Sequence, residues 1–324
     1  MPYSRVLLSL LLAAGPAVAQ PRPSPGDSVT VTGAKDRLTV RRFVETFTAP
    51  TRITGKIARW ETGICPMAVG LRTEAVRFVI QRVRDVAAQV DAPVNGSENC
   101  RPNIQIVFTT TPQGLLDNIR KKHDAFLGYA DTSAQRDKLA VFRGPIQAWY
   151  LTATQDLAGK TEIDSSRAAG AGSGIMVPCP SLFFPPYSPS GHCTGPLMEI
   201  RSIRPASAML TTGSRALGDG LRSAFHNVII VADPIKLLDH EMGTLADYIA
   251  MLALTQLSSL DVCQNLDSVT SLLTQGCSTS AQALTVNDMG YLRGLYHMNP
   301  ERALSVQEDQ IAWQIGQEIE NAGK

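Results

Sequence analysis

The spacing of apolar residues predicts helices and strands that alternate along the chain. Five valine and isoleucine side chains recur three and four positions apart in residues 73–89, which predicts an amphipathic helix capped by Thr73. A polar helix is expected over 113–122. Runs of β-branched and aromatic residues predict strands over 56–60, 103–109, 146–152 and 227–232. The last run is apolar on both faces, so we expect it in the middle of its sheet.

Three further helices are predicted in the C-terminal part. Each opens on a hydroxyl residue followed three positions later by an acidic residue, which is the pattern of a capping box. The expected ranges are 245–257, 286–296 and 306 to about 320, with the cap pairs Thr244–Asp247, Thr285–Asp288 and Ser305–Glu308. Residues 245–257 are apolar on nearly every face, which indicates a buried central helix. The whole pattern predicts an α/β (α+β) fold with a mixed sheet, in one domain over 40–324.

The first nineteen residues have the pattern of a secretory signal peptide. Arg5 precedes an apolar run over 6–14, and Ala17 and Ala19 are the small residues of a cleavage site. The run is shorter than the ~20 residues of a membrane-spanning helix. We therefore expect cleavage after Ala19, a periplasmic or secreted protein, and no transmembrane segment. Residues 20–39 are rich in Pro, Ser, Gly and charge, which predicts a flexible leader with one short strand over 28–32.

Charge and composition narrow the class of partner. The chain has 30 basic and 29 acidic residues, and loss of the signal with its single Arg5 makes the two numbers equal. Binding to nucleic acid needs a clustered cationic surplus, so we expect no nucleic-acid partner. The stretch over 155–198 is rich in Pro and Gly and predicts a long loop. Long loops are commonly functional, so we expect the contact surface there.

The six cysteines predict a disulfide framework in an oxidising compartment. Six cysteines allow fifteen pairings. Their order along the chain favours three local bridges, which are Cys65–Cys100, Cys179–Cys193 and Cys263–Cys277. Structural zinc sites need more closely spaced cysteines, so we expect neither a metal nor another cofactor.

The C-terminal part resembles metzincin-like domains of the zincin metalloprotease fold. The likeness covers roughly 228–296. Leu284, Thr285, Asp288, Leu292 and the pair Leu295-Tyr296 match the helix that closes many such domains, and residues 267–270 stand where those proteins have their Met-turn. The whole chain also resembles a family of uncharacterised secreted bacterial proteins, through residues 29–33, 58–61, 64–66, 103–104 and 246–251. These resemblances imply a degenerate zincin fold without a known activity.

The zincin metal motif is incomplete in this chain. An active zincin carries His-Glu-x-x-His on a helix, where both histidines bind zinc and the Glu activates a water. His240 and Glu241 match the first two positions, but Thr244 stands at the second histidine. In the other frame, Asp247 and Tyr248 replace the first His and the Glu, and the third ligand position falls on Leu257. Neither frame retains a zinc-binding set.

The sequence leaves three functions open. The leading hypothesis is a non-catalytic zincin-like protein that binds a partner, either a peptide or a cell-envelope component. The first alternative is a metallopeptidase-like hydrolase with a non-standard site around His240, Glu241, Asp247 and Tyr248. The second alternative is a structural envelope protein. The missing zinc ligands favour the leading hypothesis.

Overall fold

The computed structural model describes residues 32–97, 99–165, 175–177, 198–200, 219–277 and 281–323. Its main sheet has five strands in the order β1-β2-β7-β3-β4. Strands β1, β2 and β7 are parallel, β3 runs antiparallel to β7, and β4 runs antiparallel to β3. Their bounds are Pro66–Val69 for β1, Ile104–Phe108 for β2, Ile146–Gln155 for β3, Thr161–Ile163 for β4 and Arg222–Ala232 for β7. This mixed α/β (α+β) architecture in one domain confirms the expected fold class.

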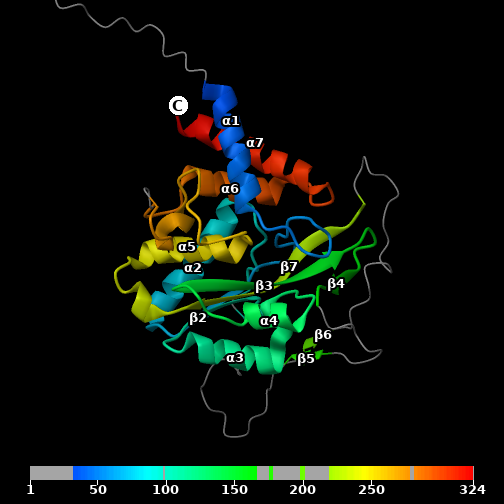
Figure 1. Ribbon diagram of the computed structural model, residues 1–324, viewed down its shortest axis with the longest axis vertical. Helices are drawn as coiled ribbons and strands as arrows, with labels where there is room; N and C mark the ends of the chain where they lie inside the picture. The colour runs from blue at the N-terminus through cyan, green and yellow to red at the C-terminus, as the bar shows by residue number, and fades with distance from the viewer. Residues whose placement is uncertain are drawn as a thin grey trace, which may run out of the picture.

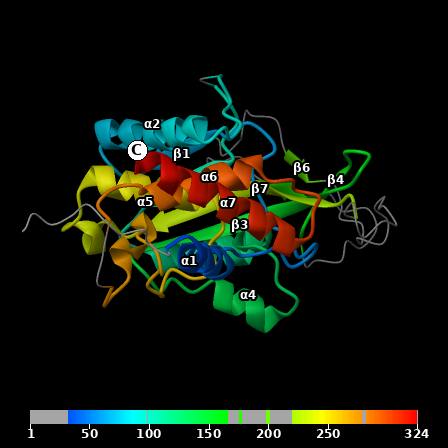
Figure 2. The same cartoon turned by 90° about the horizontal axis from the view of Figure 1, so that it is seen from above.

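Helices cover both faces of the sheet (Figure 1). One face carries α3 (Pro112–His123), the short η1 (Asp124–Leu127) and α4 (Ser133–Leu139). The other face carries α2 (Thr73–Gln89) and α5 (Met242–Leu254). A further layer, seen from above in Figure 2, consists of α1 (Thr32–Phe47), α6 (Val286–His297) and α7 (Leu304–Ala322). The remaining described elements are η4 (Pro234–Leu237), η5 (Val269–Leu273) and a separate pair of strands, β5 (Ile175–Val177) and β6 (Met198–Ile200).

The core consists of two clusters on opposite faces of the sheet. Val228 and Ile230 of β7 pack into the larger cluster with α2 and α5, whereas Ile229 and Val231 pack into the smaller cluster with α3. Successive side chains of a strand point to opposite faces, so a strand that is apolar at every position needs cover on both. The position of β7 between β2 and β3 confirms the prediction for residues 227–232.

Several other predicted elements are confirmed. Helix α2 has the expected bounds, and α3, β2 and β3 lie where the sequence predicts a polar helix and two strands. Helix α6 opens with the predicted capping box, in which Thr285 accepts from the N–H of Asp288. The expected burial of the central helix is also confirmed, because every residue from 244 to 254 is buried.

Three of the predicted helix caps are wrong. Arg72, not Thr73, is the N-cap residue of α2, and no side chain caps that helix. Helix α5 starts at Met242 and ends at Leu254, so Thr244 lies inside it and donates its hydroxyl hydrogen to the carbonyl oxygen of Gln282 at 2.7 Å. Helix α7 starts at Leu304, which places Ser305 in its first turn. The N-cap residue is one position earlier than predicted in α2, three positions earlier in α5 and two positions earlier in α7.

The flexible leader predicted over 20–39 is wrong for residues 32–39, which belong to α1. Val40, Phe43, Val44 and Phe47 of that helix are buried in the larger core cluster. Their spacing follows one helix face. The residues before Val40 are mostly polar and show no apolar spacing, so the sequence does not predict this helix. Packing of its C-terminal half against the core stabilises it.

Two further predictions on local structure need correction. Residues 56–60 form no strand and contribute only isolated bridges, Pro50↔Ile57 and Arg59↔Ala224. The Lys56 ammonium is buried there and donates to the carbonyl oxygens of Leu221 at 2.5 Å and Glu301 at 2.8 Å. The stretch 155–198 is not one loop, because it contains β4 and β5 and the first residue of β6.

Some expectations lie outside the described residues. They are the signal peptide over 1–19, the leader residues 20–31, most of the long loop, and the bridge Cys179–Cys193. Among the described residues, no helix is long and apolar enough to cross a membrane.

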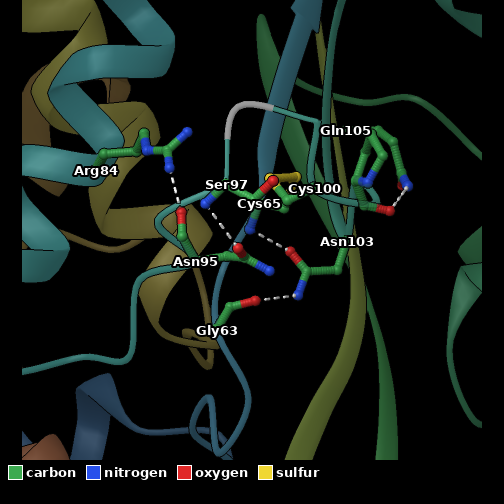
Figure 3. Close-up of a disulfide and its surroundings, with 9 residues drawn as sticks. Gly63, Cys65, Arg84, Asn95, Ser97, Cys100, Asn103 and Gln105 are labelled. Carbon is green, nitrogen blue, oxygen red and sulfur yellow. Dashed lines mark hydrogen bonds between the residues drawn. A yellow bond between two sulfur atoms is a disulfide. The ribbon is translucent and has the colours of Figure 1, made fainter.

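The two described disulfides have the predicted pairing, Cys65–Cys100 and Cys263–Cys277. Figure 3 shows the first of them beside the start of β1. Asn103 fixes the adjacent backbone, because its Oδ1 accepts from the N–H of Cys65 at 2.7 Å and its Nδ2 donates to the carbonyl of Gly63 at 3.1 Å. The bridge and this amide together hold the chain before β1 against the chain before β2.

Candidate functional site

The predicted His-Glu pair lies before α5 and not on it. Glu241 is the N-cap residue of α5, and the N–H of His240 donates to the carbonyl of Leu237 at 3.1 Å. A zincin pair projects from one helix face, four residues apart. Because His240 precedes the helix and Thr244 is bound to Gln282, this frame forms no such pair.

Asp247 is 4% exposed and has two partners in the fold. Its Oδ1 forms an ion pair with Arg82 of α2, and its Oδ2 accepts from the N–H of Leu284 at 3.0 Å. One carboxylate therefore connects α5 to α2 and to the segment before α6. This is a structural use of the charge.

Tyr248 is buried in the larger core cluster. Burial, with a smaller contribution from Asp261, raises the pKa of its phenol, so the phenol stays neutral. Glu241 and Tyr248 are seven positions apart, which is about 10 Å along a helix. Among the residues that the structure describes, no three His, Cys, Asp or Glu side chains gather in a way that could hold a metal ion. The four candidate residues thus do not converge on one point.

One opening for a ligand is the outer edge of β3. Strand β7 pairs with β3 along its whole length, from Ile146 to Gln155. Strand β4 covers only Ala153, Thr154 and Gln155 on the other side. Within the described parts of the chain, the first half of β3 therefore has a strand on one side only.

The alternation of hydrogen bonds along β3 identifies the backbone groups that point away from β7 at this edge. The N–H of Asp233 donates to the carbonyl of Pro145 at 2.8 Å, so Pro145 faces the β7 side. Alternate residues of an antiparallel strand face the same neighbour. Ala148 and Tyr150 consequently direct their N–H and C=O groups away from β7. None of the loop hydrogen bonds among the described residues ends on Ala148.

A small cavity of about 190 Å³, the edge slot, follows this part of β3. One wall consists of residues 50–52 and 256–257. These two segments are connected by a hydrogen bond, in which the N–H of Ala49 donates to the carbonyl of Gln256 at 3.2 Å. The opposite wall consists of Leu127, Gly128, Tyr129 and Leu139. Between them, residues 147–150 and Thr152 of β3 form the floor.

Gly128 limits the open edge at one end. Its φ is 94°, and a Cβ atom at this position would lie 2.9 Å from the carbonyl oxygen of Tyr150. Glycine is needed for both reasons, because few L-residues adopt this φ and none fits so close to the strand. The backbone of Gly128 covers Tyr150, and the edge around Ala148 stays open.

An ion pair fixes the polar side of the slot. Arg52 pairs with Asp131, and this contact lowers the pKa of the Asp131 carboxyl. Tyr129 is hydrogen-bonded to the same carboxylate, and burial, followed by this bond, raises the pKa of its phenol. Arg52 and Tyr129 both line the slot, so they present to it a guanidinium whose charge Asp131 compensates and a neutral hydroxyl.

Asp164 marks the point where β4 begins to cover β3. Its N–H donates to the carbonyl of Thr152 at 2.9 Å, and its carboxylate accepts from the hydroxyls of Thr152 at 2.6 Å and Thr154 at 2.8 Å. Burial raises the pKa of this carboxyl. Thr152 belongs to both the slot and this network, so the end of the slot is held in place.

Sequence reasoning missed this site, because its residues come from five separate segments of the chain. The nearest sequence signal is the strand predicted over 146–152, which gives no information on its neighbours. Comparisons with protein-family models, with curated proteins and with solved structures give no match for this chain.

Proposed function

We propose that this chain is a non-catalytic, zincin-like binding protein of the periplasm or the extracellular space, which takes up an extended peptide as an added strand on β3. The observation that carries the proposal is the open edge at Ala148, where a backbone N–H and C=O face away from β7. In strand addition, such main-chain groups supply affinity, and pockets for side chains supply selectivity.

The size of the edge slot supports a peptide. Enclosed small-molecule sites usually have volumes of ~300–1,000 Å³. The slot is smaller, at about 190 Å³, and suits a single side chain of an extended segment. Because Trp149, Leu127 and Leu139 line it beside Arg52 and Tyr129, we expect an apolar side chain with a carbonyl group next to it.

The degenerate motif also supports a binding role. In the zincin resemblance, the first His and the Glu would correspond to His240 and Glu241, and both precede α5. Asp247 is bound to Arg82 and Leu284. We propose no reaction at these residues.

The experiment selects binders from a displayed library of random ten-residue peptides and measures the affinity of one selected peptide by fluorescence anisotropy. Ala148→Pro removes the outward N–H without breaking the ladder to β7, which proline tolerates at an edge. We expect it to weaken binding about tenfold or more. Ala148→Ser is the matched control and should bind like the parent protein.

A second measurement avoids dependence on the proline variant. N-methylation of successive amides in the selected peptide should weaken binding at alternate positions only, because every second amide of an added strand faces β3. Strand addition at this edge would be rejected by any of three results. They are a folded Ala148→Pro variant that binds the peptide with unchanged affinity, an N-methylation profile that does not alternate, and a library that yields no binder.

A further inference from the structure

A second opening lies between α6 and α7, and it shares no residue with the edge slot. The two helices pack closely because Gly290 and Gly294 lack side chains; a Cβ atom on Gly294 would lie 2.8 Å from the Cα of Ile311. At the open end of this contact is a groove of about 340 Å³. Its volume falls in the range of ~300–1,000 Å³ that small-molecule sites occupy.

The groove has an aromatic side chain that the fold does not use. Trp313 lines it and is 65% exposed, whereas Ile311 and Ile315 of the same helix are fully buried. An exposed indole beside a groove offers an apolar face and one N–H donor to a ligand. Met298 and Val306 add apolar surface beside the indole.

The groove has no free cationic group among the residues that line it. His297 contacts Asp91 at 2.9 Å, and Asp309 contacts at 3.3 Å the side chain of Arg41, which also pairs with Glu45 at 2.9 Å. An anionic ligand would find no uncompensated positive charge at these positions. The groove is therefore not suited to an anionic ligand.

Two carboxamides give the groove oriented polar groups. The Oε1 of Gln310 accepts from the N–H of Asn299 at 2.9 Å, which leaves its NH₂ group as a donor. The Nε2 of Gln314 donates to Glu318 at 3.2 Å, which leaves its carbonyl oxygen as an acceptor. Both residues line the groove, so a donor and an acceptor lie beside an apolar aromatic face.

We propose that this groove binds a neutral saccharide. A sugar ring has an apolar C–H face, which packs on an indole, and a rim of hydroxyls, each of which both donates and accepts. Those two features match Trp313 on the one hand and Gln310 and Gln314 on the other. The site is independent of peptide binding at the edge slot.

The test uses the intrinsic fluorescence of the protein. Of its three tryptophans, Trp60 and Trp149 are 1% and 2% exposed, and Trp313 is the one that lines the groove, so a ligand in the groove acts on Trp313. The probes are neutral trisaccharides of β-linked glucose, α-linked glucose and β-linked N-acetylglucosamine, each titrated to millimolar concentrations. We expect a saturable fluorescence change with at least one of them.

Calorimetric titration of variants with the same trisaccharide locates the site. Trp313→Ala should weaken binding about tenfold or more, and Gln310→Leu should weaken it as well. Ile319→Ala changes another exposed apolar residue of α7, 41% exposed and outside the groove, and should bind normally. Since Trp313 is at the surface, its replacement should leave the melting temperature almost unchanged.

Four results would overturn the proposal. The first is that no trisaccharide gives a saturable fluorescence change, and the second is that the folded Trp313→Ala variant binds the trisaccharide as tightly as the parent. The third is that choline chloride, and none of the sugars, gives a saturable fluorescence change. The fourth is that the protein self-associates and that Trp313→Ala abolishes this association. The third would assign the groove to a cationic group on the indole face, and the fourth would assign it to a second copy of the chain.

Discussion

The carboxylate of Asp247 accepts a hydrogen bond from the backbone N–H of Leu284 at 3.0 Å. Its other oxygen pairs with Arg82 on α2. Helix α5 is buried along almost its whole length, and Asp247 is its one charged residue. Leaving the partly buried N–H of Leu284 without an acceptor costs more free energy than the bond itself contributes.

Asp247→Ala should therefore lower the free energy of unfolding by about 2–3 kcal/mol, measured by urea denaturation. Asp247→Asn keeps an acceptor for Leu284 and should lose less than the alanine variant. Binding of the selected peptide to the folded fraction should be unchanged in both. Loss of binding without loss of stability would instead make Asp247 part of a functional site.

The confirmed parts of the fold are those whose pattern is local. In α2 the spacing of the apolar residues identifies the helix face that is buried, and in β7 the run of apolar residues shows that both faces of the strand are buried. The Thr285–Asp288 box is also local, since the two residues contact each other.

The failures arise where tertiary contacts outweigh the local pattern. Thr244 has the same motif as Thr285, but its hydroxyl meets Gln282, which is 38 positions away. The edge slot combines residues from Pro50 to Leu257, and no periodicity in the sequence relates them. A strand can be predicted from its own residues, whereas an open edge depends on which other strands pair with it.

Removal of either described disulfide should destabilise the protein, and the longer one should matter more. The Cys65–Cys100 pair has a sequence separation of 35 and the Cys263–Cys277 pair one of 14. Loop entropy gives about 4 kcal/mol for the first and about 3 kcal/mol for the second. Paired alanine substitutions, compared by urea denaturation, check this order. An equal or reversed order would show that the loop-entropy term does not dominate.

Asp164 should make part of the stability depend on pH. Burial raises the pKa of its carboxyl in the fold, so the folded protein holds the proton more tightly than the unfolded chain does. This contribution is fully present below the unfolded pKa and is lost as the pH rises through the folded pKa. In Asp164→Asn it is absent, so the stability of the variant relative to the parent should rise over that pH window.

Asp131→Asn is the control of opposite sign for that measurement. Arg52 lowers the pKa of the Asp131 carboxyl, so its contribution is present above the unfolded pKa and is lost as the pH falls through the folded pKa. The pair is exposed, and its effect should be small. Thermal melts of the three proteins from acidic to neutral pH test both signs. A constant difference between the parent and Asp164→Asn would reject the role given to Asp164.

Gly128→Ala should be more damaging than Gly159→Ala, although both glycines have a positive φ. Gly159 has a φ of 78° and nothing within 4 Å of an added Cβ atom, so alanine there costs about 1 kcal/mol from backbone strain alone. Gly128 combines a φ of 94° and a ψ of −179° with an added Cβ atom 2.9 Å from the carbonyl oxygen of Tyr150. Strain and the steric clash together should cost about 3 kcal/mol in the free energy of unfolding.

Because the clash pushes the wall of the edge slot away from β3, Gly128→Ala should also weaken binding of the selected peptide, whereas Gly159→Ala should not. Equal losses of stability in the two variants would mean that the chain at Gly128 moves freely away from β3, and the slot would then lack the fixed wall on which peptide selectivity depends.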